Sequence, residues 1–264
     1  MTALLEARGV GYSYGARPVL QDVSFTVEAG ANLGLVGESG AGKTTLLRLL
    51  LGLAVPSEGE IFSQGNRFDA RDRAQLRAYR RLTQTVFQDP YSSLDPRQSV
   101  GQIIAEPLRS LGIARGRVEL ATLVAAALLA VGLPADAFSR YPHEFSGGQR
   151  QRIAIARAIV PHPRVLLADE PVSALDVTTR VKIIDLLAEL SQGGLDGQPP
   201  MTLVLVSHDL GVVASLCERI VVLERGRIVE QGVTRSVLAT PQHPYTQRLL
   251  ASVTRLPPGR EAAL

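Results

Sequence analysis

The first third of the chain consists mainly of short apolar runs with the length of β-strands. Two alternating runs, over residues 4–10 and 23–27, are broken by glycines and by Asp22 and predict two strands. A third run, over 31–36, predicts a buried strand that leads directly into a glycine-rich loop. A helix over 45–53 is expected to follow the loop. Two further strands are predicted over 60–62 and 83–87.

The pattern becomes helical over about residues 96–159, which are rich in alanine and leucine and are interrupted by prolines. Continuously apolar runs return over 164–168 and 202–206, as expected of parallel strands that are covered on both faces. A helix over 178–190 is predicted between them, and a hairpin around residues 225–226 is predicted after them. The order predicts an α/β core that is interrupted by a helical lobe.

Composition limits the class of protein. The 264 residues suffice for one α/β domain with an inserted lobe, and Cys217, the only cysteine, cannot form a disulfide within the chain. The first residues lack the basic start and apolar run of a signal peptide. The longest apolar stretch, over 121–133, is shorter than the roughly twenty residues that cross a bilayer. The chain is therefore expected not to span a membrane.

The net charge is only +3, but its distribution is uneven. The cations are nearly all arginines, so Lys43 is notable as one of two lysines. The densest basic run lies over 67–81, where Asp69 and Asp72 interrupt the arginines and no aromatic stacking pattern accompanies them. This pattern favours a solvated helix face over a nucleic-acid surface.

The glycine-rich loop after the third strand matches the phosphate-loop pattern in full. Its glycines would let backbone N–H groups close around phosphate oxygens. Lys43 would reach the β- and γ-phosphates, and the Thr44 hydroxyl would be a ligand of Mg²⁺. The predicted nucleotide-binding residues are Gly37, Glu38, Ser39, Gly40, Ala41, Gly42, Lys43, Thr44 and Thr45.

Three other predicted strands deliver polar residues at their carboxyl ends. Asp169 and Glu170 follow the strand over 164–168. Such an acidic pair is often only a helix cap. In a chain with a phosphate loop, however, it predicts that Asp169 is a Mg²⁺ ligand and that Glu170 orients the attacking water. His208 follows the next strand and is predicted to sense the γ-phosphate, with a capping or core histidine as the alternative. Gln88 ends another strand where the helical lobe begins, and is predicted to contact Mg²⁺ or water.

A second glycine-rich turn precedes the apolar helix that ends the lobe. It consists of Ser146, Gly147, Gly148 and Gln149. Because the N-terminus of a helix binds anions, this turn is a second candidate phosphate site. One chain with one nucleotide has no obvious use for two such sites.

In order and separation, these motifs resemble the nucleotide-binding subunit of an ATP-binding cassette (ABC) transporter, over essentially the whole chain. The matches are Walker A over 37–45, the Q-loop at Gln88, the signature over 146–149, Walker B over 165–170, the D-loop over 173–176 with Asp176, and the switch histidine at His208. The resemblance implies ATP and Mg²⁺ as cofactors, with Thr44, Gln88 and Asp169 toward the metal and Asp176 near the nucleotide.

The same resemblance implies an α/β fold with a P-loop NTPase (RecA-like) core and a mainly parallel sheet. An N-terminal antiparallel β subdomain and an inserted α-helical subdomain, over about 96–159, would complete it. The ATPase domain would cover residues 1–240, and a C-terminal tail would cover 241–264. A loop is predicted over 191–200, and the last residues of the tail are expected to be frayed.

Two positions qualify the resemblance. The family places an aromatic that stacks on adenine at Tyr14, but Tyr12 would face the same side of a strand and remains an alternative. Phe145 stands where leucine is commoner in the signature. Both side chains are apolar and the following four residues are intact, so activity is expected to be retained.

Segments over 87–97, 141–145 and 169–177, together with His243-Pro244-Tyr245, resemble the peptide and nickel importer branch. Within them, 91–97 resembles the second cassette of the pair. This implies a second ABC ATPase subunit, identical or different, two transmembrane permease subunits and an extracellular or periplasmic substrate-binding protein. The chain would sit peripherally on the cytoplasmic face of the inner membrane. Peptide, nickel, glutathione and sugar-derived cargo stay open, and no iron–sulfur cluster is expected.

The resemblance also implies that the signature turn completes the γ-phosphate site of a partner cassette. A soluble ABC-type ATPase acting on nucleic acid or ribosomes is the alternative, although neither zinc cysteines nor a coiled-coil insertion is visible and no nucleic-acid partner is expected. A P-loop kinase or GTPase does not account for the signature turn or for Glu170. A module that binds without catalysis is disfavoured, because every catalytic position is filled.

Overall fold

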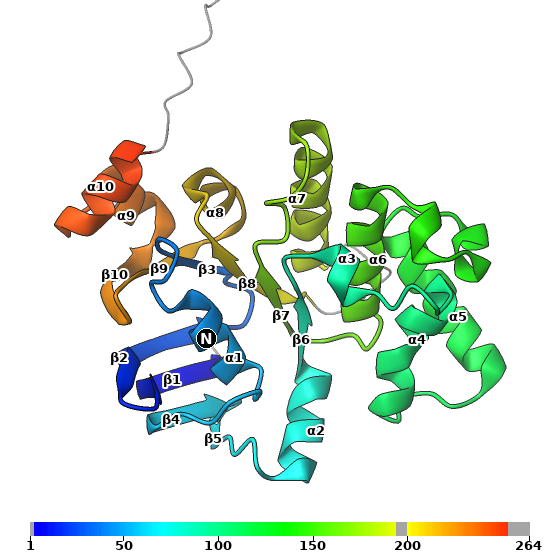
Figure 1. The fold of residues 1–264 in the computed structure, drawn as a ribbon, viewed down its shortest axis with the longest axis horizontal. Coiled ribbons are helices and arrows are strands. Elements are labelled where there is room, and N and C mark those ends of the chain that lie inside the picture. The colour runs from blue at the N-terminus through cyan, green and yellow to red at the C-terminus, as the bar shows by residue number, and fades with distance from the viewer. Residues whose placement is uncertain (1–2, 194–199, 253–264) are drawn as a thin grey trace, which may run out of the picture.

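The computed structural model describes residues 3–193 and 200–252, which build two β-sheets and a group of helices (Figure 1). The first sheet is antiparallel throughout, with the strand order β2-β1-β4-β5. Its strands are β1 (Ala3–Tyr14), β2 (Arg17–Glu28), β4 (Glu58–Ser63) and β5 (Asn66–Arg67).

The second sheet has six strands in the order β10-β9-β3-β8-β7-β6. All neighbouring pairs are parallel except β9 and β10, which form the predicted hairpin. The strands are β3 (Leu33–Val36), β6 (Thr83–Val86), β7 (Val165–Asp169), β8 (Thr202–Ser207), β9 (Arg219–Glu224) and β10 (Arg227–Val233). An α/β fold with a mainly parallel sheet and an N-terminal antiparallel sheet is thereby confirmed.

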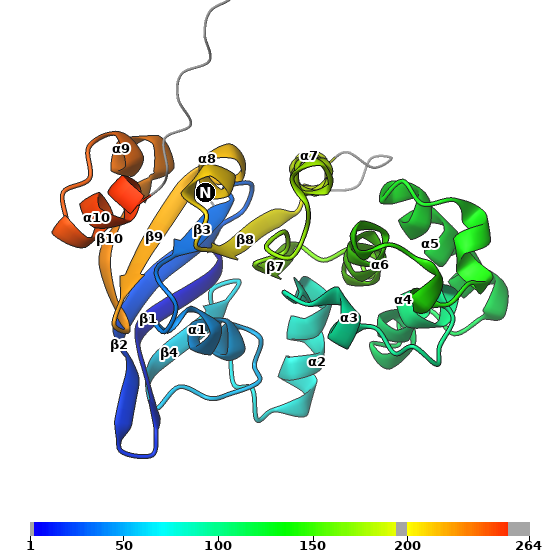
Figure 2. The ribbon, with the colours of Figure 1, turned by 45° about the horizontal axis from the view of Figure 1, so that its top comes forward.

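The helices divide into those on the sheets and those beside them (Figures 1 and 2). The group α3–α6 lies beyond the β6 edge of the second sheet, whereas α9 and α10 lie at the opposite edge. The helices are α1 (Lys43–Leu50), α2 (Arg73–Leu82), α3 (Pro90–Ser93), α4 (Val100–Ser110), α5 (Arg117–Ala130), α6 (Gly147–Ile159), α7 (Val177–Ser191), α8 (Leu210–Leu216), α9 (Thr234–Ala239) and α10 (Pro244–Ser252).

The central strands are apolar along their whole length because each face of the sheet packs against a different core. Along β7, Val165 and Leu167 pack with α1 and the first sheet. Leu166 and Ala168 face the other way, toward the core formed with α6, α7 and α8. Successive strand residues point to opposite faces, so an uninterrupted apolar run is what a strand between two cores requires.

Strands β1 and β2 are longer than predicted, because the residues interpreted as strand ends are irregularities within the strands. The pairing of β1 with β2 shifts register between Ala7 and Val10. Gly9 and Asp22 both have positive φ, at 57° and 52°. Bulges of this kind bend a strand without ending it, so both strands continue past them to the hairpin at residues 15–16.

The arginine-rich stretch is largely exposed on α2, but two of its side chains do more than face solvent. Arg77 Nε and Arg81 Nη2 both donate to the carbonyl oxygen of Leu111, at 3.2 Å and 2.7 Å. Leu111 ends α4, where free carbonyls attract cations. The two arginines therefore connect α2 to the end of a lobe helix, a contact that the charge pattern alone did not predict.

None of the helices in the described ranges 3–193 and 200–252 combines the length and the hydropathy needed to cross a bilayer. Part of the loop predicted over 191–200 lies outside the described residues, as does the segment 253–264 that was expected to be frayed. The segment 241–264, predicted as a tail, contains α10 in its described part. The domain boundaries at 240 and around the lobe remain predictions.

Candidate functional site

The phosphate loop lies between β3 and α1, as predicted, and its glycines are required by close backbone contacts. A Cβ atom on Gly37 would lie 2.3 Å from the carbonyl oxygen of Leu223. Gly42 has φ of 108° and is the last residue before the helix. The helix consequently begins at Lys43, two residues before its predicted start, which places the N–H groups of its first turn at the loop.

Lys43 is buried and turns back toward its own loop. Its Nζ donates to the carbonyl oxygens of Gly37, at 2.6 Å, and Glu38, at 2.9 Å. Burial lowers the pKa of the Lys43 ammonium, whereas the carboxylates of Glu170 and Asp169 oppose that shift. An anion that enters the loop can replace these two carbonyls as the partner of the ammonium group.

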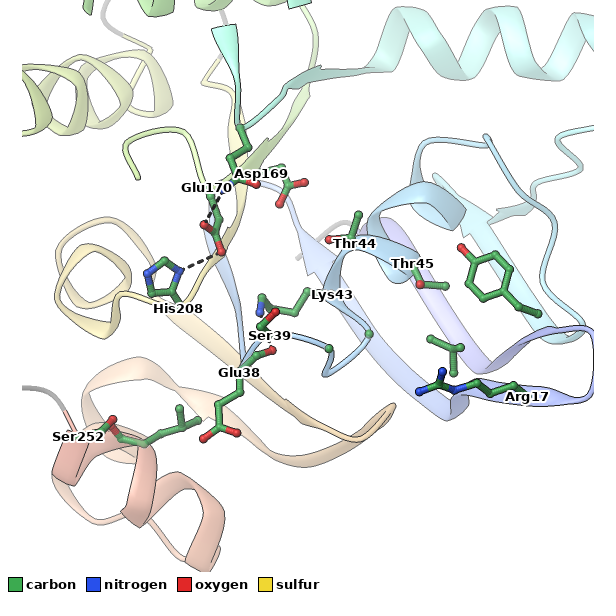
Figure 3. Close-up of a pocket in the computed structure, with 16 residues that line it drawn as sticks. Arg17, Glu38, Ser39, Lys43, Thr44, Thr45, Asp169, Glu170, His208 and Ser252 are labelled. Atoms are coloured by element: carbon green, nitrogen blue, oxygen red, sulfur yellow. Dashed lines mark hydrogen bonds and ion pairs between the residues drawn. The ribbon is translucent and has the colours of Figure 1, made fainter. Parts of the chain in front are cut away.

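The phosphate loop and the polar strand ends open onto one cavity of about 900 Å³ (Figure 3). A cavity of this size accommodates a nucleotide. The residues that line it are Tyr14, Arg17, Val19, Glu38, Ser39, Gly40, Gly42, Lys43, Thr44, Thr45, Gln88, Asp169, Glu170, His208, Leu249 and Ser252. Of the predicted loop residues, Gly37 and Ala41 are buried behind this surface.

Glu170 is the centre of a hydrogen-bonded group on one wall of the cavity. Its Oε1 lies 2.9 Å from His208 Nδ1, and its Oε2 accepts a hydrogen bond from Gln88 Nε2 at 3.2 Å (Figure 3). The backbone of Glu170 has a positive φ of 42° and donates its N–H to the carbonyl oxygen of Val206. Non-glycine residues rarely adopt this conformation and keep it only where the surrounding structure holds the backbone. The sheet therefore fixes the backbone from which the Glu170 carboxylate projects.

Gln88, Glu170 and His208 follow the ends of three different strands, β6, β7 and β8, and meet on this wall of the cavity. The carboxylate of Glu170 can orient a water molecule and accept its proton, while His208 and Gln88 fix its two oxygens. His208 is itself exposed on 61% of its side chain, whereas Glu170 is exposed on only 17%. The imidazole therefore remains available to a ligand in the cavity.

Asp169 is the last residue of β7 and lies beside Glu170. Burial raises the pKa of its carboxyl group, the neighbouring Glu170 carboxylate adds to the rise, and Lys43 opposes it. With the Thr44 hydroxyl and the Gln88 amide, it supplies the oxygen ligands that Mg²⁺ prefers. In the described part of the chain, no group of three or more His, Cys, Asp or Glu side chains could hold a metal.

The two candidate aromatic residues occupy different environments although their rings touch. Tyr14 lines the cavity and is exposed on 48% of its surface. Tyr12 packs against the core between the two sheets, and its ring meets that of Tyr14 edge to face at 5.0 Å. Only the ring of Tyr14 is therefore placed to stack on a base in the cavity.

The signature turn is well formed but lies away from the cavity. Ser146 caps α6: its Oγ accepts from the Gln149 N–H at 3.3 Å, and Gln149 Oε1 accepts from the Ser146 N–H at 2.9 Å. A Cβ atom on Gly148 would lie 2.3 Å from Thr179 Cγ2, so the helix packs too closely on α7 for a larger residue. Within the described residues, positions 146–149 do not line the cavity.

Asp176 is also outside the cavity and has a clear structural role. It caps α7 by accepting a hydrogen bond from the Thr179 N–H at 3.0 Å. Hydrogen bonding by the Thr179 side chain, and then by its backbone N–H, lowers the pKa of the Asp176 carboxyl. Its predicted contact with a nucleotide, like that of the signature turn, is not made in this chain's own cavity and stays a prediction.

Sequence reasoning did not identify four of the residues that line the cavity: Arg17, Val19, Leu249 and Ser252. The first two lie at the start of β2, just after the turn that follows Tyr14. The other two come from α10, within the segment predicted as a tail. The one signal for α10 was His243-Pro244-Tyr245, because a proline after a polar residue is typical of a helix start.

The sequence profile of the family described as "ABC transporter" matches residues 20–173. The chain belongs to the ABC transporter family. The ABC-type ATPase predicted from the motifs is thereby confirmed. A second profile, described as "Oligopeptide/dipeptide transporter, C-terminal region", matches residues 229–264, which include α10.

Curated relatives and solved structures agree with this assignment. Glutathione import ATP-binding proteins GsiA from Salmonella paratyphi A and Escherichia coli K12 are 47% and 48% identical over 91% and 92% of this chain. The chain spans 38% of the length of each. The structure of cbiO1 from Clostridium perfringens, part of the ABC transporter complex cbiONQ, matches with a TM-score of 0.79 at 29% identity over 90% of this chain and 92% of that one.

A second solved structure is an ATP-binding cassette in a dimeric post-hydrolysis state bound to ADP and Pi. It matches with a TM-score of 0.74 at 30% identity and covers 88% of this chain and 99% of that chain. Because the two ABC structures match over 90% and 88% of this chain, the P-loop NTPase fold predicted from the sequence is confirmed.

Proposed function

We propose that this chain is the ATP-hydrolysing subunit of an importer that takes up short peptides through separate membrane subunits. The observation that carries the proposal is the cavity in which the phosphate loop faces Glu170 and His208. The names of the relatives support import of glutathione, which is itself a small peptide. The match of residues 229–264 to an oligopeptide and dipeptide transporter region favours peptide over nickel as cargo.

ATP would lie along the cavity, with its base on Tyr14 and its phosphates on the loop that precedes α1. Lys43 would exchange its contacts with the Gly37 and Glu38 carbonyls for phosphate oxygens. Thr44, Gln88 and Asp169 have the oxygen atoms to hold Mg²⁺ together with the phosphates. When bound, that ion would neutralise charge on the transferring phosphoryl group.

Glu170 would act as the group that orients water and accepts its proton. Its contact with His208 Nδ1 keeps the carboxylate directed into the cavity, and the exposed part of the imidazole can donate to the γ-phosphate. Gln88 joins this wall to the start of α3 and the helical group. Through this contact, the position of the helical group and the geometry of Glu170 would depend on each other.

A second ATPase subunit would complete the site. The signature turn lies outside this chain's own cavity, and a structural neighbour is a cassette dimer. This supports a partner cassette, identical or different, whose signature covers the γ-phosphate held here. Two permease subunits and an extracellular or periplasmic binding protein would complete an importer, with this chain attached to the cytoplasmic face of the membrane.

The proposal is tested by reconstituting the chain with its membrane subunits in lipid vesicles. We expect ATP-dependent uptake of a peptide such as glutathione, and hydrolysis that the loaded binding protein stimulates. Uptake of nickel instead would correct the cargo and leave the mechanism intact. Stimulation of hydrolysis by nucleic acid or ribosomes, with no membrane subunit bound, would instead support the soluble ATPase and contradict import.

The base-stacking assignment predicts different outcomes for the two tyrosines. Tyr14→Ala is expected to weaken ATP binding about tenfold, because stacking on an aromatic ring contributes roughly 1–3 kcal/mol per base. Tyr12→Ala should instead lower thermal stability, since Tyr12 packs on the core. ATP titration and thermal unfolding of both variants check this. Equal losses of affinity in the two variants would contradict the assignment.

A further inference from the structure

Helix α10 has a start that the sequence specifies in detail. His243 Nδ1 accepts a hydrogen bond from the Tyr245 N–H at 3.2 Å, and Pro244 is the first residue of the helix. The carboxylate of Glu230, from β10, accepts hydrogen bonds from the N–H groups of Gln242 and His243, at 2.9 Å and 3.1 Å. These contacts hold the start of α10 at the β10 edge of the second sheet (Figure 1).

The side chain that reaches the loop is Tyr245. It is 3% exposed, and its hydroxyl accepts a hydrogen bond from the backbone N–H of Glu38 at 2.8 Å. Further along α10, Leu249 and Ser252 line the cavity, with Ser252 on the side of Glu38 (Figure 3). The helix therefore forms one wall of the cavity and also binds the loop from behind.

The N–H that Tyr245 binds belongs to the same peptide unit as the carbonyl that holds Lys43. This unit joins Gly37 to Glu38: its oxygen accepts from Lys43 Nζ at 2.6 Å, and its N–H donates to Tyr245 at 2.8 Å. A peptide unit is planar, so fixing its N–H also fixes the direction of its oxygen. Tyr245, which is 207 positions away from Glu38, thus sets the orientation of the Gly37 carbonyl. This carbonyl competes with phosphate for Lys43.

We propose that Tyr245 is a positioning residue of the nucleotide site, which sets the affinity for ATP by fixing the Gly37–Glu38 peptide. This inference rests on the proposed function, because it assumes that ATP occupies the cavity. Contacts other than the hydroxyl also dock α10: Tyr245 and Leu249 both pack in the large core, and Glu230 holds the start of the helix. Removing the hydroxyl should therefore change the loop while leaving the helix in place.

The test is Tyr245→Phe, compared with Gln247→Ala, which changes an exposed residue of the same helix. Without this acceptor the Gly37–Glu38 peptide can rotate and the loop is no longer held in one conformation before ATP binds. The cost of ordering the loop on binding should outweigh the weaker competition of the Gly37 carbonyl for Lys43, so the Kd and KM for ATP should rise about three- to tenfold. The value of kcat at saturating ATP should stay within about twofold, because Glu170 and His208 are untouched. Gln247→Ala should bind ATP like the unmodified chain, and neither variant should unfold at a clearly lower temperature.

Other results would separate the possible failures. ATP binding by Tyr245→Phe equal to that of the unmodified chain would overturn the positioning role and leave the proposed function standing. Matching losses of kcat, affinity and thermal stability would also overturn it, since they would show that the hydroxyl only supports packing. If the unmodified chain itself fails to bind ATP, the proposed function fails first.

Discussion

Replacing Glu170 with glutamine is expected to reduce ATP hydrolysis by about 100-fold or more while ATP binding is retained. Glutamine has the same shape and can keep a contact with His208, but its amide cannot accept a proton from water. ATP should therefore accumulate on the phosphate loop, and the ATP-bound dimer should persist. Phosphate release at saturating ATP measures the first effect, and gel filtration with ATP measures the second.

The matched control is Asp185→Asn, which makes the same chemical change on an exposed position of α7. It should hydrolyse ATP at the unmodified rate and form no persistent dimer. Hydrolysis by Glu170→Gln at that same rate would show that the carboxylate is not the group that activates water. The assignment would then move to another polar residue of the cavity.

The sequence predicted much of this site because its residues lie at the ends of strands. Parallel strands bring their carboxyl ends to one edge of a sheet, so Gln88, Glu170 and His208 had to approach the loop that follows β3. The order and the type of the predicted elements were sufficient for this prediction. The alternation of strand-length apolar runs with helical ones predicted the α/β core and its helical lobe, whereas the separate antiparallel sheet was implied by the family resemblance.

The parts that the sequence did not predict are contacts between distant segments. Tyr245 meets Glu38 across most of the chain, and Arg77 meets Leu111 between a core helix and a lobe helix. Neither contact leaves a periodic pattern in the sequence, because each forms only when completed helices and strands pack together. The bulge at Gly9 was missed for a different reason: a glycine in a strand has the same local signal whether the strand ends or only bends.

Ser146→Ala is expected to lower ATP hydrolysis by about 100-fold while leaving ATP binding to the phosphate loop nearly unchanged. The reason is that Ser146 lies outside this chain's own cavity and would contact the nucleotide of a partner cassette. The substitution also removes a helix cap, which by itself costs about 1 kcal/mol of stability. That cost has to be measured separately from the loss of activity.

The chain contains its own control for the cap. Ser99 starts α4 with the same reciprocal pair of hydrogen bonds, made with Gln102, as Ser146 makes with Gln149. Ser99→Ala should therefore lose similar stability but keep its hydrolysis rate. Two measurements decide the matter: ATP titration of each variant and phosphate release by the assembled dimer. If Ser146→Ala loses ATP affinity and hydrolysis to the same extent, the turn serves this chain's own nucleotide, and the shared site is wrong.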